Sequence, residues 1–188
     1  MILAFLRAEA GSHRFANCFL PALTKAGLSR SELIDKGDPK NKSQNAIRRT
    51  ILQAYRGFGQ NRLLFQGFPD VVVWRRVEIE FADHVRLRYA NKTTWVPLSD
   101  GTRLVTRLAE KVARGEVPSD PADHINAIQD LLTAGKQLPE LIAAEGAESS
   151  LILVEGHCRA TAYACLGWRE GIPAFIASSP LLHRWHNF

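Results

Sequence analysis

The 188-residue sequence is poor in cysteine and lacks any long apolar run. Its three cysteines, Cys18, Cys158 and Cys165, are too few and too irregularly spaced for a disulfide framework or a thiolate metal site. The first six residues are apolar, but Arg7 and Glu9 interrupt them before they reach the length of a signal peptide core or a membrane span. We therefore expect reduced thiols, a cytoplasmic location and no association with a membrane.

Histidine is also too sparse to predict a metal site. His183 and His186 are spaced i, i+3, but they have no carboxylate or thiolate neighbour to complete a ligand set. Disorder-prone composition is absent, since 46% of the residues are hydrophobic and 23% are charged. A chain of this length can form one sizeable core or two small modules. The residue patterns predict an α/β (α+β) protein, with a mainly helical region over residues 1–70 and a mixed region over residues 71–188.

Acidic residues are scarce in the first third of the chain. Residues 1–62 hold eleven Lys or Arg against four Asp or Glu, whereas the net charge of the whole chain is only +5. Such an excess favours an anionic partner such as nucleic acid, although a solvated basic face is the commoner reason for a patch of this size.

An amphipathic helix is predicted after Ser43 in this basic region. Its apolar residues recur on one stripe from Ile47 to Phe58, while Arg48, Arg49 and Arg56 face elsewhere. The Gly27 turn followed by this basic helix loosely resembles a helix-turn-helix, with a longer loop than the standard motif has. If the protein binds DNA, we expect these three arginines to contact its phosphates.

Several other elements are predicted from local patterns. Helices are expected over residues 12–26, with Phe15 on the apolar face, and over residues 104–113. Alternation predicts strands over residues 71–81, 84–89 and 93–96, which we expect to form an antiparallel sheet. Residues 118–121 read as a linker or loop before a helix that starts at Asp123.

The most informative stretch runs from Leu151 to Gly167. Four apolar residues, 151–154, predict a strand buried on both faces, and residues 160–166 predict a short helix that Gly167 ends. Glu155 and Gly156 then form the strand-to-helix turn. The first N–H groups of a helix lack internal partners and carry the positive end of the helix dipole, so a phosphate would fit at this turn.

Side chains of the turn can add to such a site. Arg159 can make a bidentate contact to a phosphate, Gly156 lets the backbone approach closely, and His157 and Cys158 project near the same point. At a helix N-terminus beside Arg159, the pKa of Cys158 is expected to be lowered. In the alternative interpretation, Arg159 pairs with a loop carboxylate or with a buried Glu155, His157 bonds the backbone, and the turn is purely structural.

The ten residues Val154-Glu155-Gly156-His157-Cys158-Arg159-Ala160-Thr161-Ala162-Tyr163 resemble the box of the ParB/sulfiredoxin-like superfamily, in which a strand, a Gly-His-x-Arg turn and a helix bind nucleotide phosphates. Residues 124–142 resemble that family's helix, Gly stop and Pro-led strand, and residues 171–176 resemble its closing strand. The resemblance covers between a third and a half of the chain. It implies that residues 71–188 form a domain of this type, a mixed sheet with helices whose core spans residues 121–180.

The resemblance also implies a ligand, namely a nucleotide such as ATP, ADP or CTP with Mg²⁺, or a phosphorylated small molecule. The residues that would bind its phosphates are Gly156, His157, Cys158, Arg159 and Thr161. Free-standing members of the family include an ADP-dependent serine kinase and proposed nucleases, so phosphoryl transfer and phosphodiester hydrolysis are the candidate reactions. Catalysis would need a carboxylate or a proton donor, for which the candidates are Glu155, His157 and Asp123.

Two points stay open on the sequence alone. Sulfiredoxin-like members place a nucleophilic cysteine where this chain has His157, which argues against sulfinic-acid reductase chemistry and leaves open whether the protein is an enzyme. The alternative function is that of a non-enzymatic DNA-binding or regulatory protein that uses the basic N-terminal helices. No oligomeric state is predicted.

Overall fold

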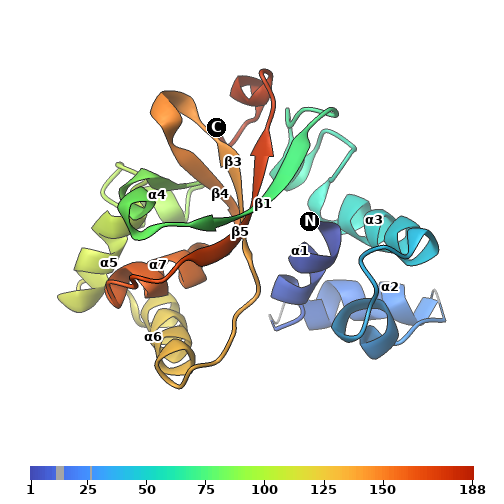
Figure 1. Ribbon diagram of the computed structural model, residues 1–188, viewed down its shortest axis with the longest axis horizontal. Coiled ribbons are helices and arrows are strands. Elements are labelled where there is room, and N and C mark those ends of the chain that lie inside the picture. The colour runs from blue at the N-terminus through green and yellow to red at the C-terminus, as the bar shows by residue number, and fades with distance from the viewer. Residues whose placement is uncertain (12–14, 26) are drawn as a thin grey trace. The chain divides into compact units, whose positions relative to one another are not determined.

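The computed structural model describes residues 1–11, 15–25 and 27–188 (Figure 1). The chain divides into two compact units, Met1–Asp70 and Val71–Phe188, and each unit has its own hydrophobic cluster. Helices and a mixed sheet are both present, so the predicted α/β class is confirmed. Within the described ranges, every helix falls short of the length and hydropathy that crossing a bilayer requires.

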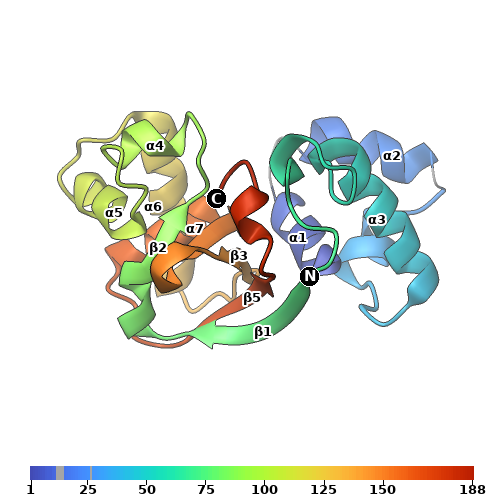
Figure 2. The same cartoon turned by 90° about the horizontal axis from the view of Figure 1, so that it is seen from above.

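The first unit is built from helices (Figure 2). They are α1 (Ile2–Glu9), α2 (Leu20–Lys25) and α3 (Lys42–Arg56), with two π-helical turns, η1 (Phe15–Phe19) and η2 (Ser31–Asp35), and a 3₁₀ turn, η3 (Leu63–Phe65). Of the helix predicted over residues 12–26, the structure contains η1 and α2. Ser12 to Arg14, Ala26 and the side chain of Phe15 lie outside the described part of the chain.

Helix α3 begins and ends at identifiable caps. Asn41, rather than the predicted Ser43, is the N-cap, and its side-chain oxygen accepts a hydrogen bond from the Gln44 amide at 3.0 Å. The helix ends at Gly57, whose φ of 77° is readily adopted only by glycine. Ile51 and Leu52 are buried on its inner face.

Arg48 is fully buried in this unit, although the sequence pattern places it among exposed basic residues. Its guanidinium donates to the carbonyls of Leu33 at 2.8 Å and Asp38 at 2.9 Å, and to two polar side chains of its own helix. Gly37 makes room for it, because a Cβ at that position would overlap the guanidinium. Arg48 therefore fixes the loop between η2 and α3, and the prediction that it contacts DNA is wrong.

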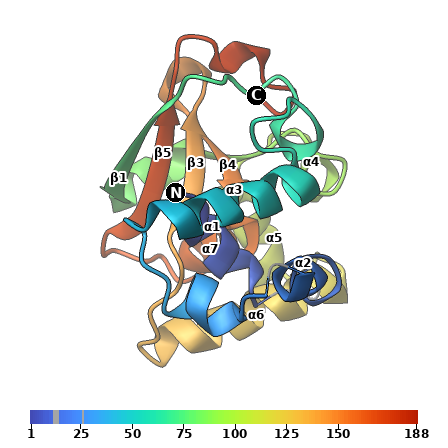
Figure 3. The ribbon, with the colours of Figure 1, turned by 90° about the vertical axis from the view of Figure 1, so that its right-hand side faces the viewer.

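The second unit is a five-stranded mixed sheet in the order β1-β5-β3-β4-β2 (Figure 3). The strands are β1 (Val73–Ile79), β2 (Leu87–Tyr89), β3 (Leu141–Glu145), β4 (Leu151–Glu155) and β5 (Ile172–Ser178). β1 is antiparallel to β5 and β4 is antiparallel to β3, while β3 runs parallel to β5 and β2 parallel to β4. β1 and β2 therefore lie at opposite edges of the sheet.

Three helices, α5 (Val105–Ala113), α6 (Ser119–Thr133) and α7 (His157–Cys165), cover one face of this sheet. Leu151 and Leu153 of β4 contribute to the core between the sheet and these helices, and the helices contribute Leu108, Ile125 and Tyr163. All four residues 151–154 are at most 5% exposed. The prediction of a strand buried on both faces, followed by a helix, is therefore confirmed.

Two predicted strands of this unit are wrong in whole or in part. Residues 84–89 form only the short β2, because Phe81–Arg86 is a 3₁₀ helix, η4, that buries His84. Residues 93–96 overlap the helix α4 (Trp95–Leu98). Trp95 stacks on Tyr89 with ring centroids 5.0 Å apart, and this tertiary contact outweighs the strand propensity of the segment.

Two predictions about connectivity are also corrected. The expected antiparallel sheet of residues 71–96 does not form, since β1 and β2 pair with different strands of the C-terminal half. Residues 118–121 are not a linker, because α6 begins at Ser119 rather than at Asp123. Pro121 lies in the first turn of α6, where its missing N–H leaves no intrahelical bond unmade.

We predict that Arg48→Ala lowers the free energy of unfolding by about 3 kcal/mol, because it leaves two carbonyl groups without their buried donor. Arg49→Ala is the matched control, since Arg49 is exposed and its guanidinium lies 5.2 Å from the Phe58 ring centroid. We expect the control to change stability by less than about 1 kcal/mol. Urea denaturation followed by circular dichroism measures both, and equal losses would contradict the structural role of Arg48.

Candidate functional site

The turn of residues 155–159, called here the 155–159 turn, joins β4 to α7. Gly156 has φ 96° and ψ 26°, and a Cβ on it would lie 2.6 Å from Leu141 Cδ2 and 3.0 Å from Arg159 Nη2. Only glycine avoids both the backbone strain and these contacts. No side chain caps the N-terminus of α7. The first backbone N–H groups of α7 therefore lie directly after the end of β4, and no N-cap side chain accepts a hydrogen bond from them.

The guanidinium of Arg159 packs against Gly156 and is mostly buried, with the residue only 8% exposed. Its Nη2 lies 3.4 Å from Glu155 Oε1 and 3.4 Å from the Glu140 carbonyl oxygen. Both distances are long for charge-assisted hydrogen bonds. The Nε atom is buried and has no hydrogen-bond partner. Arg159 thus retains donor capacity that the protein itself does not use.

One carboxylate and one backbone carbonyl border this guanidinium. The carboxylate is that of Glu155, which the sequence indicates, and the carbonyl is that of Glu140, a residue that the sequence pattern does not indicate and that directly precedes β3. Glu140 Oε1 also lies 3.3 Å from Arg76 Nη2. The pairing of β3 with β4 brings the two glutamates to the same end of the sheet, and a local sequence pattern does not reveal that pairing.

The third predicted catalytic residue, Asp123, is exposed on α6. The carboxylate of α6 that acts on the turn is Asp120, whose charge contributes to raising the pKa of Cys158. No such interaction of Asp123 is found among the described residues. The helix begins at Ser119, four residues earlier than predicted. Asp120 therefore lies in its first turn, the position that the sequence pattern assigns to Asp123.

His157 is held flat in a cluster of aromatic rings. Its ring stacks on Trp95, with centroids 5.0 Å apart and an angle of 11°, and lies 5.9 Å from the Tyr89 ring at an angle of 10°. The residue is buried. This packing fixes the direction in which α7 leaves the turn, and it gives the imidazole a structural role whether or not it also contacts a ligand.

Two of the predicted phosphate ligands are corrected by their surroundings. The Thr161 hydroxyl is fully buried, donates to the His157 carbonyl at 2.8 Å and shares a 2.6 Å hydrogen bond with the Tyr89 hydroxyl, so it ties α7 to β2 and cannot reach a ligand. Burial, together with the charge of Glu155, raises the pKa of the Cys158 thiol to about 11. The expected lowering by Arg159 is present but smaller, because desolvation of the thiolate outweighs it.

The predicted DNA-binding surface is also corrected. Arg56 Nη2 lies 3.2 Å from Glu9 Oε1, both side chains are largely buried, and the guanidinium lies 5.6 Å from the Phe5 ring centroid. Arg56 therefore joins α3 to α1. With Arg48 fully buried, Arg49 is the one of the three predicted arginines that is exposed.

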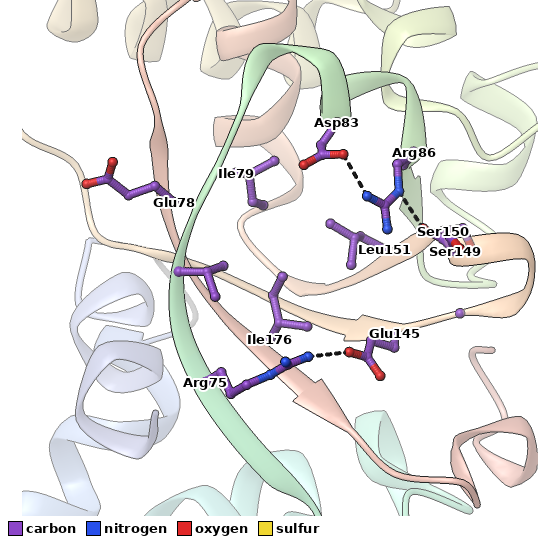
Figure 4. A pocket seen from close by; sticks show the side chains of 12 residues that line it. Arg75, Glu78, Ile79, Asp83, Arg86, Glu145, Ser149, Ser150, Leu151 and Ile176 are labelled. Atoms are coloured by element: carbon purple, nitrogen blue, oxygen red, sulfur yellow. Dashed lines mark hydrogen bonds and ion pairs between the residues drawn. The ribbon is translucent and has the colours of Figure 1, made fainter.

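A cavity of about 480 Å³ lies elsewhere in the second unit (Figure 4). Four of its charged groups form two ion pairs, Arg75 with Glu145 at 2.6 Å and Arg86 with Asp83 at 2.6 Å, and Glu78 also lines it. Its apolar lining comes from the core side of the sheet, namely Val77, Ile79, Leu151 and Ile176. Each arginine is neutralised by its own carboxylate and Glu78 adds a negative charge, so the cavity does not favour an anion, and the 155–159 turn is the stronger candidate site for one.

Comparisons with protein-family models, with curated proteins and with solved structures find no match to this chain. Over the described residues, no group of three or more histidine, cysteine, aspartate or glutamate side chains is arranged to hold a metal ion. The functional assignment therefore depends on the geometry of the 155–159 turn.

We predict that Cys158 reacts slowly with alkylating agents in the folded protein, because its raised pKa of about 11 leaves little thiolate near neutral pH. At pH 8 the rate should be at least about tenfold lower than in the urea-unfolded chain, and it should rise with pH towards pH 11. Iodoacetamide labelling with peptide mass spectrometry measures this rate. Cys165, whose pKa is also raised to about 11 by burial, is the internal reference. A labelling rate that levels off below pH 8 would contradict the assignment.

Proposed function

We propose that the 155–159 turn binds the phosphate groups of a nucleotide or of a phosphorylated small molecule. The observation that carries this proposal is the buried Arg159 Nε, which has no partner and lies beside the uncapped N-terminus of α7. A buried donor on a charged group is costly to leave unpaired, and a phosphate oxygen is the acceptor that a guanidinium and helix amides bind best.

The local geometry supports this ligand. The first amides of α7 and the guanidinium of Arg159 meet at Gly156, because the missing Cβ lets the guanidinium pack directly against the turn. The present contact of Arg159 with Glu155, at 3.4 Å, is loose. A phosphate that accepts from Nε would add to this contact rather than compete for the same nitrogen.

The carboxylate of Glu155 favours a nucleotide with Mg²⁺ over a bare phosphate. A negative group beside the site would repel an uncompensated anion, whereas Mg²⁺ is commonly held by one or two carboxylates together with substrate phosphates. Glu155 is the residue that would hold the ion, and the ion would neutralise phosphate charge. The sequence resemblance to a nucleotide-binding box supports ATP, ADP or CTP as the ligand, in agreement with the expected cytoplasmic location.

Phosphoryl transfer or phosphodiester hydrolysis is the reaction class that this arrangement suits. Glu155 is only partly buried, so its carboxylate is the candidate to accept a proton from an attacking hydroxyl or water. Arg159 would hold the transferred group in position and spread its negative charge. We do not extend the proposal to DNA binding by α3, because Arg48 and Arg56 are engaged within the first unit.

The test is a thermal-shift and calorimetric panel of ATP, ADP, CTP and GTP, each with Mg²⁺. A ligand that binds only the folded protein stabilises it by mass action, about 2.7 kcal/mol at a hundred times Kd. We expect at least one nucleotide to bind. Arg159→Met should weaken the affinity for that nucleotide at least about tenfold, because the variant loses a charge-assisted hydrogen bond to phosphate. Arg114→Met, at an exposed arginine paired with Glu116, is the matched control and should keep the parent affinity.

The fold of each variant is checked by circular dichroism. If Arg159→Met unfolds, Arg159→Lys keeps the charge while removing the planar fork, and it should fold with reduced affinity. Binding of no nucleotide, or undiminished binding by a folded Arg159 variant, would overturn the proposal.

A further inference from the structure

β1 is an edge strand of the sheet. It is the first strand of the sheet order and, among the strands of the described residues, pairs with β5 alone. At the opposite edge β2 is short, and Arg88 makes an additional bridge with Leu104. An edge strand as long as β1 presents backbone N–H and C=O groups on its outer side, which is the template for pairing with another strand.

The side chains along this edge are exposed and of mixed character. Val73 is 62% exposed and Phe81, just beyond the end of β1, is 40% exposed, which is high for apolar residues. The Arg76 side chain is 67% exposed, and Glu78 is also exposed. An edge that carries both signs of charge can be complementary to itself when it is turned by 180°.

We propose that the outer edge of β1 pairs with β1 of a second copy of this chain. The two strands run antiparallel about a two-fold axis perpendicular to the sheet, so the two sheets become one continuous sheet. Such an interface is isologous, which means that the same residues contribute from both copies.

The symmetry restricts the register of this pairing. A two-fold axis perpendicular to the sheet keeps each face on its own side, and directly opposed residues of antiparallel strands lie on the same face. Figure 4 shows the side chains of Arg75 and Glu78 on opposite sides of β1, as alternation along the strand requires. Odd-numbered residues must therefore oppose odd-numbered ones, and one residue of the strand must lie opposite its own copy, with the axis midway between the two.

Charge then selects the central residue. The usual strand length is about five residues or more. A pairing of that length fits within β1 only if the residue opposite its own copy is Arg75, Arg76 or Val77. The first two choices oppose an arginine to its own symmetry copy. The choice of Val77 places Arg76 opposite Glu78 at both symmetric positions, and opposite charges at such positions stabilise a sheet.

The same register brings exposed apolar side chains near each other at its ends. With Val77 at the centre, Val73 of one copy comes near the end of β1 in the other copy, where Phe81 begins η4, so both side chains can lose contact with water. The existing ion pair of Arg76 with Glu140, at 3.3 Å, does not prevent the pairing. The Arg76 side chain is 67% exposed, which weakens the pair, and a guanidinium can contact two carboxylates.

Charge reversal tests the proposal by sedimentation. We expect the parent protein to form dimers that dissociate on dilution. Arg76→Glu and Glu78→Arg should each weaken dimerisation at least about tenfold, because each opposes like charges twice. The double variant restores opposite charges and should return the dissociation constant to within about threefold of the parent value. Lys136→Glu, at an exposed position after α6, is the control and should leave the dimer intact.

Cross-linking tests the register. Opposed residues of antiparallel strands have Cα atoms about 4.5–5.5 Å apart, which a disulfide can bridge. Val77→Cys should therefore give a covalent dimer under mild oxidation, whereas Arg75→Cys, opposite Ile79, should not. Both variants keep the three native cysteines, so their background is the same. A parent protein that stays monomeric up to about 0.5 mM, a double variant that is not restored, or equal cross-linking at both positions would overturn the proposal.

Discussion

The left-handed backbone of Gly156 is the constraint on which the candidate site depends. At this residue the chain leaves β4 and enters α7 with no intervening loop, and the space that a Cβ would fill is taken by Leu141 of β3 and by the guanidinium of Arg159. Because Leu141 is part of the core, the sheet itself holds the turn in place. The uncapped amides, Arg159 and Glu155 are thereby fixed at one point before any ligand arrives, and such preorganisation favours binding.

Two buried arginines show how the same side chain can serve different purposes. Arg48 donates four hydrogen bonds of 2.6 to 2.9 Å to the protein, so its guanidinium is fully used in holding a loop. Arg159 is buried to a similar degree, yet its contacts are 3.4 Å long and its Nε has no partner. Burial alone thus does not distinguish an arginine whose donors are all used within the protein from one with a donor to spare, whereas the count and length of the hydrogen bonds do, and the proposed ligand site depends on that spare donor.

The sequence predicts β4, Gly156 and α7 correctly, because a buried apolar run and a glycine at a turn are local signals. It fails where long-range contacts decide. Trp95 is helical because it stacks on Tyr89 and His157; Tyr89 is near it in the sequence, but a local pattern reveals neither that stacking nor the approach of the distant His157. Helical periodicity indicates which face Arg48 and Arg56 occupy, but not that Leu33 and Glu9 meet them there.

The site residues follow the same pattern. Glu155 and Arg159 are spaced i, i+4, so their proximity is predictable, whereas the Glu140 carbonyl and the charge of Asp120 reach the turn through strand order and helix packing. The predicted direction of the pKa shift of Cys158 is wrong. The charge of Arg159 and the helix end, which lower the pKa, are visible in the sequence. The desolvation that raises the pKa and outweighs them depends on the packing between α6 and α7.

The most direct test of the central claim is a titration of ¹⁵N-labelled protein with ADP and Mg²⁺, followed through the backbone amides by two-dimensional NMR. If phosphates bind at the N-terminus of α7, the amide signals of His157, Cys158 and Arg159 should show the largest shifts, together with the Nε–H signal of Arg159. The amides around the cavity at Arg75 and Arg86 should stay unchanged. Shifts confined to that cavity, or no change at the 155–159 turn at saturating nucleotide, would contradict the account.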